Sequence, residues 1–192
     1  MIKIPKFVLP ERFMPYKGMI HFFVVLFLAN IFWKLTISGD ETDNIVSFLG
    51  INLTSQFNIV ANDVTSKTYA FLHFMGSGVH WLSHNILKYD NGVAVRIVWS
   101  CTPIKQAFIF LCIIFFYKGY FIHKLWFMPL GLIVIYFFNI FRISAIVAII
   151  ENHPESFEFF HVYFFKYVFY AVIFAMWIFW EEKIVKRKRI EN

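Results

Sequence analysis

The sequence predicts an all-α integral membrane protein. It would consist of a bundle of four transmembrane helices and a small outer cap. Of the 192 residues, 59% are hydrophobic, 22% are aromatic and only 16% are charged. A soluble domain carries roughly 25% charged residues, and 27 Phe could not all be buried in one small core. Lipid must therefore be the main solvent, and the length indicates a single domain.

Four apolar stretches are long enough for spans of about 20 residues: 18–37, 98–117, 126–150 and 157–180. The first has no small-residue cleavage site and is predicted to be an uncleaved anchor. Residues 38–97 are more polar and form the predicted cap. Within them, the apolar piece 69–82 is interrupted by Gly76-Ser77-Gly78. This piece is a re-entrant segment, an interfacial segment, or a fifth or sixth helix.

The basic residues predict the orientation. Four lie in the tail 1–17, two lie in the loop before Trp126, and five lie in the tail 181–192, all on one side if four spans alternate. The opposite side collects seven carboxylates: Asp40, Glu41, Asp43, Asp63, Asp90, Glu151 and Glu155. By the positive-inside tendency, both tails are cytoplasmic. The net charge of +6 therefore indicates membrane topology, and no nucleic-acid partner is predicted.

Cys101 begins the second stretch, in Ser100-Cys101-Thr102-Pro103. Thr is a common N-cap and Pro suits the first helical position, so a helix is predicted to start there. The positive helix end and Lys105 would both favour the thiolate and lower the pKa of Cys101. An ordinary buried cysteine is the alternative. Cys112 lies roughly 16 Å further along the helix, too far for a disulfide, and is predicted to be a packing residue.

Arg142 stands inside the apolar stretch 126–150. An arginine there costs about 2.5–3.5 kcal/mol on insertion scales, and it cannot lose its charge. It lies about 12 Å from the end of the stretch, within partial snorkelling distance. Asn139, three residues earlier, shares its helix face. Pairing with a carboxylate or with backbone carbonyls is the structural alternative, and a functional role is favoured.

His161 lies about one turn into the last stretch, with Glu158 three residues before it. A carboxylate on that face would fix the imidazole tautomer and support its basicity. Taken alone, a histidine at an aromatic-rich helix end is more often an interfacial residue. However, Cys101, Arg142 and His161 occur on three successive stretches, all in the outer third of the bilayer. This coincidence predicts one shared site.

The pattern resembles the exosortase and archaeosortase family. These multi-helix membrane proteins carry a Cys at the start of one helix, an Arg within the next, commonly as Asn-x-x-Arg, and a His at the start of the following one. This chain has Cys101, then Asn139-Ile140-Phe141-Arg142, then Phe160-His161. The resemblance covers roughly residues 63–180. Many exosortases have Cys-Ser-Gly at the nucleophile, whereas this chain has Cys101-Thr102-Pro103.

The resemblance implies a cysteine protease or transpeptidase in a bacterial cytoplasmic membrane, with its site facing outward. Cys101 would be the nucleophile, His161 the general acid and base, and Arg142 the oxyanion partner, which is compatible with their chemistry. Asn139, Glu158 and Lys105 are predicted to support them or to contact substrate. The implied partner is a membrane-anchored protein with a C-terminal sorting signal, besides the lipid bilayer itself.

The remaining polar groups suggest no cofactor. His80 and His84 have a spacing that could bind a metal on a helix, but no Cys or clear carboxylate completes a site, so no metal is predicted. The segment Asp90-Asn91-Gly92 predicts a hairpin turn. The alternative function is a non-catalytic accessory membrane protein of an export or polysaccharide system. A small-solute transporter is a weaker option, because the chain has no internal repeat.

Overall fold

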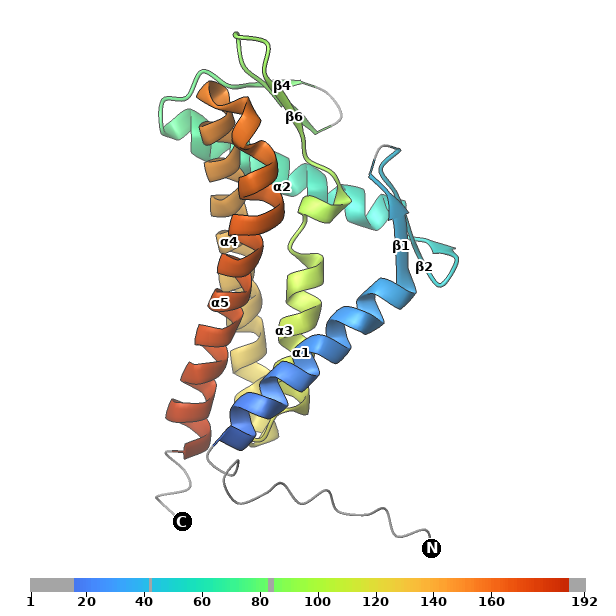
Figure 1. Ribbon diagram of the computed structural model, residues 1–192, viewed down its shortest axis with the longest axis vertical. Coiled ribbons are helices and arrows are strands. Elements are labelled where there is room, and N and C mark those ends of the chain that lie inside the picture. Colours follow the sequence, from blue (N-terminus) through green and yellow to red (C-terminus); the bar gives the residue numbers. More distant parts are fainter. Residues whose placement is uncertain (1–15, 42, 83–84, 187–192) are drawn as a thin grey trace, which may run out of the picture.

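The computed structural model describes residues 16–41, 43–82 and 85–186, and it is mostly helical (Figure 1). Three of its helical segments are long and apolar enough to cross a membrane: α1 (Lys17–Thr36), α4 (Phe121–Asn152) and the segment Pro154–Lys186. They match the first, third and fourth predicted spans. The last segment contains η3 (Pro154–Ser156), η4 (Phe159–Phe164), α5 (Phe165–Phe179) and η5 (Trp180–Lys186).

The two predicted tails fall largely outside the described residues. Residues 1–15 and 187–192 belong to this undescribed part. Residues 181–186, which the sequence assigns to the C-terminal tail, are helical and continue the last segment. The start of α1 and the end of the last segment lie at the same end of the molecule (Figure 1).

The second predicted span is shorter than expected. Only α3 (Ile104–Phe116), 13 residues, is a regular helix, and it is preceded by the single turn η2 (Trp99–Cys101). At 1.5 Å per residue α3 extends about 20 Å, less than the ~30 Å hydrocarbon core. Thr102 is extended, with ψ at 155°, because a following proline disfavours the helical conformation. The prediction of four full spans is therefore wrong for this one.

The region 38–97 is not all-helical, so the all-α class needs correction. It holds α2 (Thr54–Phe74) and two three-stranded antiparallel sheets. The first contains β1 (Ile37–Asp40), β2 (Ile45–Phe48) and β3 (Ile51–Asn52), and the second contains β4 (His80–Leu82), β5 (Ile86–Lys88) and β6 (Ala94–Arg96). The piece 69–82 is the end of α2, a turn with Gly76 at φ 81°, and β4. A left-handed φ there suits glycine and ends the helix.

The hairpin predicted around Asp90-Asn91-Gly92 is confirmed. Strands β5 and β6 pair in antiparallel register. The Tyr89 amide donates to the Val93 carbonyl at 2.8 Å, and Gly92 takes a φ of 90°.

Helix α2 lies across the ends of α3 and α4 (Figure 1) and packs on α4. Its buried side chains recur at intervals of three or four residues, the spacing of one helix face: Phe57, Ala61, Val64, Thr65, Thr68 and Leu72. This helix was not predicted, because polar residues interrupt its apolar ones and its sequence is not that of a membrane span.

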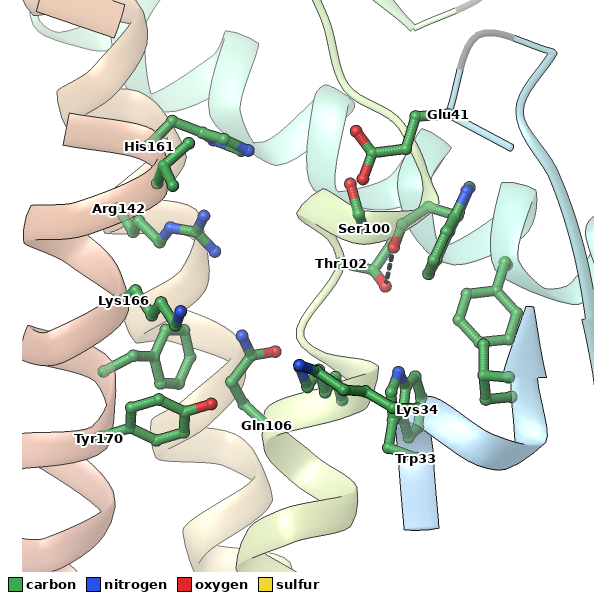
Figure 2. Close-up of a pocket in the computed structure, with 16 residues that line it drawn as sticks. Trp33, Lys34, Glu41, Ser100, Thr102, Gln106, Arg142, His161, Lys166 and Tyr170 are labelled. Atoms are coloured by element: carbon green, nitrogen blue, oxygen red, sulfur yellow. Dashed lines mark hydrogen bonds between the residues drawn. The ribbon is translucent and has the colours of Figure 1, made fainter. Parts of the chain in front are cut away.

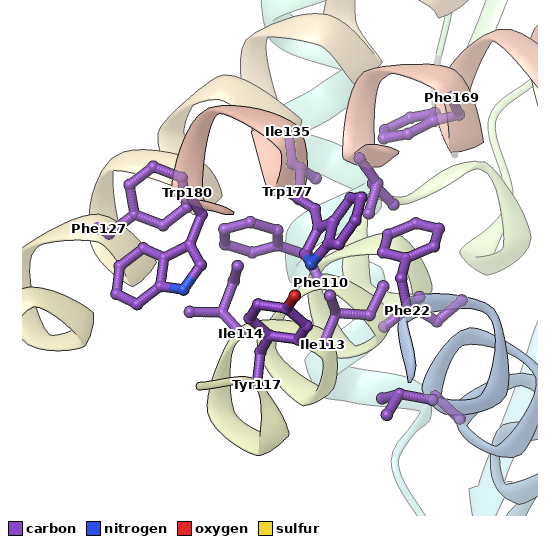
Figure 3. Packing of buried hydrophobic residues seen from close by; sticks show 14 residues of the cluster. Phe22, Phe110, Ile113, Ile114, Tyr117, Phe127, Ile135, Phe169, Trp177 and Trp180 are labelled. Atoms are coloured by element: carbon purple, nitrogen blue, oxygen red, sulfur yellow. The ribbon is translucent and has the colours of Figure 1, made fainter. Parts of the chain in front are cut away.

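The main core fills the space between α1, α3, α4 and α5, away from α2. Aromatic rings dominate it, including Phe22, Phe110, Trp177 and Trp180 (Figure 3). A second cluster lies beneath α2 and contains Cys101, Ile143 and Val147. The outer faces of the long helices keep large apolar side chains exposed, such as Phe27 at 66% and Phe137 at 63%. Apolar surface of this kind is typical of contact with lipid.

Close packing at Gly131 gives a first prediction. A β-carbon at this position in α4 would overlap the fully buried Phe110 ring and lie 2.7 Å from the Met176 methyl carbon. We expect Gly131→Val to lower the stability of the detergent-solubilised protein by about 2 kcal/mol or more, because overpacking strains the helix contacts. Thermal unfolding measures the effect. Gly78→Val is the matched control, since a β-carbon there meets nothing within 4 Å. Equal effects of the two changes would contradict this packing.

Candidate active site

A cavity of about 440 Å³ lies where α1, α3, α4 and the last helical segment meet the turn η2. Figure 2 shows Arg142 and His161 pointing into it from α4 and the last segment, while Ser100 and Glu41 face them from the other side. Two of the three residues predicted to share a site therefore line one cavity. The third, Cys101, lies between the lining residues Ser100 and Thr102 but is not itself part of the lining.

Arg142 is a buried charge inside α4. Its side chain is 5% exposed, and no carboxylate in the described part of the chain forms an ion pair with it. Its Nε has no hydrogen-bond partner among the described residues. A guanidinium has five N–H donors in a fixed plane and cannot be neutralised. Arg142 therefore presents a fixed positive charge, with donors available to an oxyanion or a carboxylate that enters the cavity.

His161 lies in the π-helical segment η4, where the helix is locally widened. Its ring stacks on Phe157, four residues earlier, with the centroids 5.0 Å apart and the planes within 10°. Such π-helical turns occur frequently at functional sites. Here the stacking fixes the plane of the imidazole and leaves its edge toward the cavity (Figure 2).

Glu158 does not join the site as the sequence predicted. It is exposed, it is absent from the cavity lining, and within the described residues no hydrogen bond or ion pair connects it to His161. The expectation relied on α-helical spacing, in which residues three apart share a face. In a π-helix the hydrogen bonds run five residues apart, so the turn is wider and these faces rotate.

Cys101 is held in place by Asn139. The Asn139 side-chain amide donates a 3.0 Å hydrogen bond to the Cys101 carbonyl, and Asn139 is fully buried. This contact ties the turn η2 to α4 one turn before Arg142. The asparagine predicted to support the site thus connects the cysteine segment to the arginine helix.

The expected low pKa of Cys101 is contradicted. The thiol, which precedes α3 and lies outside the apolar helices, is only 6% exposed and packs among apolar residues. This burial raises the pKa of Cys101 above its ordinary value, while the charge of Arg142 acts in the opposite direction. Desolvation disfavours the thiolate more than the helix end and one cation favour it. Lys105 is not among the groups that shift this pKa.

Several lining residues were not singled out by the sequence as site residues, among them Lys34, Glu41, Ser100 and Lys166. The signal available for Lys34 and Lys166 was their charge within apolar helices, which is costly and rare. Lys105 lines the cavity as predicted. Ser100 Oγ, Gln106 Oε1 and Arg142 Nε have no partner among the described residues, so the wall offers both donors and acceptors.

The described histidines of this region have other partners. His73 stacks on Tyr69 and His80 pairs with Asp90 at 3.1 Å, while residue 84 lies outside the described residues. No group of three His, Cys, Asp or Glu side chains that could hold a metal occurs in the described ranges. Both cysteines are free thiols.

Comparison of the chain with protein-family models, with curated proteins and with solved structures gave no match. The chemistry of the cavity must therefore be argued from its own residues.

The Asn139 contact gives a second prediction. Asn139→Ala leaves the Cys101 carbonyl without its donor inside the protein, which costs about 1–3 kcal/mol. We expect a lower thermal stability together with faster alkylation of Cys101, because the turn η2 is released from α4. Asn152→Ala is the control, since Asn152 is exposed at the end of α4. Unchanged alkylation in Asn139→Ala would contradict the positioning role.

The raised pKa of Cys101 gives a third prediction. It is tested in a protein with Cys112→Ser, so that Cys101 is the one thiol that can be alkylated. With its pKa raised, Cys101 holds little thiolate at neutral pH, so iodoacetamide should react slowly and faster as the pH rises above the ordinary thiol range. Arg142→Gln removes a charge that lowers the pKa and should slow the reaction further at a given pH.

Lys105→Gln is the matched control for that experiment, because Lys105 does not contribute to the pKa of Cys101. Rapid alkylation at neutral pH, or equal slowing by Lys105→Gln and Arg142→Gln, would favour the thiolate that the sequence analysis expected.

Proposed function

We propose that this protein is a membrane cysteine peptidase or transpeptidase of the exosortase and archaeosortase type. It cleaves C-terminal sorting signals of exported proteins on the outer side of a bacterial cytoplasmic membrane. One observation carries the proposal: Arg142, which has no ion pair among the described residues, and the stacked His161 line one cavity, and its wall includes the residues on either side of Cys101. Arg142 and His161, from distant parts of the chain, thus line one space, and Cys101 lies next to its wall.

In the proposed mechanism, the Cys101 thiol first loses its proton to the His161 imidazole. The thiolate then attacks the carbonyl carbon of the scissile peptide bond, and the resulting oxyanion accepts hydrogen bonds from Arg142. As the C–N bond breaks, the imidazolium returns the proton to the leaving amine. A thioester remains on Cys101. Water or an amine acceptor then attacks the thioester carbonyl and gives its proton to His161. The C–S bond breaks, and the imidazolium returns the proton to the sulfur, which regenerates the thiol.

The buried position of Cys101 agrees with this sequence of steps if its thiol is activated only when substrate is bound. In the free protein, burial keeps the proton on sulfur. When a substrate carbonyl lies beside Arg142, the thiol would lose its proton to His161 and the thiolate would then attack. The turn η2 is a single 3-10 turn followed by the extended Thr102.

The proposed location rests on the long apolar helices and on charge placement. Three helical segments are apolar enough to cross a membrane. Lys17 of α1 and Lys183 and Lys186 of η5 lie at one end of the bundle (Figure 1), the cytoplasmic side by the positive-inside tendency. The cavity is near the opposite end, beneath α2. This is where a substrate anchored by its own C-terminal helix would present the residues outside its span.

One observation favours a second function, that of a non-catalytic accessory membrane protein of an export or polysaccharide system. Cys101 is buried, packs as an apolar residue, and does not line the cavity. In that function Arg142 would serve as a polar contact for a partner helix, and Cys101 would only fill space.

Processing of a co-expressed substrate separates the two functions. The substrate is a protein from the same genome with a short motif, a transmembrane helix and a basic tail at its C-terminus. We expect Cys101→Ala to abolish cleavage, Arg142→Ala to slow it about 10²–10³-fold, and His161→Ala to slow it about 10²–10⁴-fold. Immunoblotting of precursor and product over time measures the rates.

Two controls match the catalytic changes in residue type. Cys112→Ala and His153→Ala alter the other thiol and an exposed loop histidine, and both should process substrate at the rate of the unaltered protein. Arg142→Lys should retain part of the activity, since it keeps the charge but not the planar fork. Cleavage that survives Cys101→Ala would eliminate the cysteine mechanism and leave the accessory function.

A further inference from the structure

Three lysines from three helices converge at one edge of the cavity. Lys34 comes from α1, Lys105 from α3 and Lys166 from the last helical segment, and Figure 2 shows Lys34 and Lys166 reaching toward the cavity from its two sides. They are close enough that the charges of Lys34 and Lys166 both act on Lys105. Bringing like charges together is unfavourable unless an anion is present to compensate.

No carboxylate among the described residues pairs with these lysines. Glu41 is the only acidic residue among the described residues that line the cavity. Helix stability does not explain the cluster either. Lys105 lies in the first turn of α3, the positive end of the helix, where a cation is disfavoured. The start of α3 also has no side-chain cap, so its amide groups add to the attraction for an anion.

A second, apolar cavity of about 530 Å³ continues from the same three lysines along α1. Near the lysines its walls are polar, and further along α1 they are apolar. One turn below Lys34, the Asn30 side chain accepts a 3.1 Å hydrogen bond from the Tyr170 hydroxyl, and beyond them lie Phe27 and Phe23. From Lys34 to Phe23 the groove runs about 16 Å along α1, which suits part of an acyl chain.

We propose that this groove binds a phospholipid with an anionic headgroup. The headgroup phosphate is held by Lys34, Lys105 and Lys166, and an acyl chain lies along Phe23 and Phe27 of α1. A free phosphate would use only the lysines, whereas the adjoining apolar groove fits the hydrocarbon part of a lipid. The bound headgroup lies at the edge of the Arg142 and His161 cavity, because the lysines line both spaces. The inference rests on the membrane location in the proposed function, and not on its chemistry.

Lipid binding is tested on the Cys101→Ala protein, so that the result is independent of any peptidase activity. In detergent micelles, native mass spectrometry measures retention of phosphatidylglycerol, of zwitterionic phosphatidylcholine and of inorganic phosphate. We expect selective retention of phosphatidylglycerol. Replacing Lys34, Lys105 and Lys166 with Gln should weaken it about a hundredfold, from the contribution of each lysine to anionic lipid binding.

One control removes the same number of charges away from the site, and the other keeps the positive charges at the site. Replacing the exposed Lys67, Lys88 and Lys118 with Gln removes three charges elsewhere and should leave binding unchanged. Replacing the three site lysines with Arg should retain it, which separates loss of charge from misfolding. Equal binding by the site and control Gln triples would overturn the proposal, as would equal retention of phosphatidylcholine. Inorganic phosphate that displaces the lipid at similar affinity would make the site one for a small anion instead.

Discussion

The buried guanidinium of Arg142 is the constraint on which the site depends. A charge that cannot be removed, placed in an apolar helix, requires polar surroundings or a polar space. The structure supplies the space: a cavity with His161 and Ser100 on its walls, and no carboxylate that pairs with the arginine in the described ranges. Asn139, one turn earlier, connects the same helix to the Cys101 carbonyl. The arginine helix therefore organises both the cavity and the cysteine segment beside it.

The short third helix provides the room for this cavity. Because Pro103 forces Thr102 into an extended conformation, α3 begins only at Ile104 and the chain above it forms the turn η2. Helix α2 then lies across the bundle and closes that end. The cavity and the apolar cluster around Cys101 thus meet at the turn η2, before the regular part of α3 begins.

The cavity and the groove along α1 are both lined by Lys34, Lys105 and Lys166. Four cations and one carboxylate line the cavity among the described residues, so its field is positive. An oxyanion, a substrate carboxylate and a lipid phosphate would all be attracted there. Arg142 is buried in α4, whereas Lys34 and Lys166 are more exposed. In the two proposals, Arg142 would bind an oxyanion that forms during the reaction, and the lysines would bind a lipid phosphate.

The sequence alone predicted the three long apolar helices, the hairpin at Asp90-Asn91-Gly92, and the position of Arg142 as a charge within an apolar helix, because span length, turn residues and a charge in an apolar run are local properties. Tertiary structure decided the rest. Whether Cys101 is exposed depends on packing against Ile143 and Val147, which the helix start could not reveal. Glu158 does not line the cavity, because the π-helical turn changes which residues share a helix face. Lys34 and Lys166 do line it, because α1 and the last segment both border the cavity. Burial and convergence depend on contacts between residues far apart in the chain, and local periodicity carries no information about them.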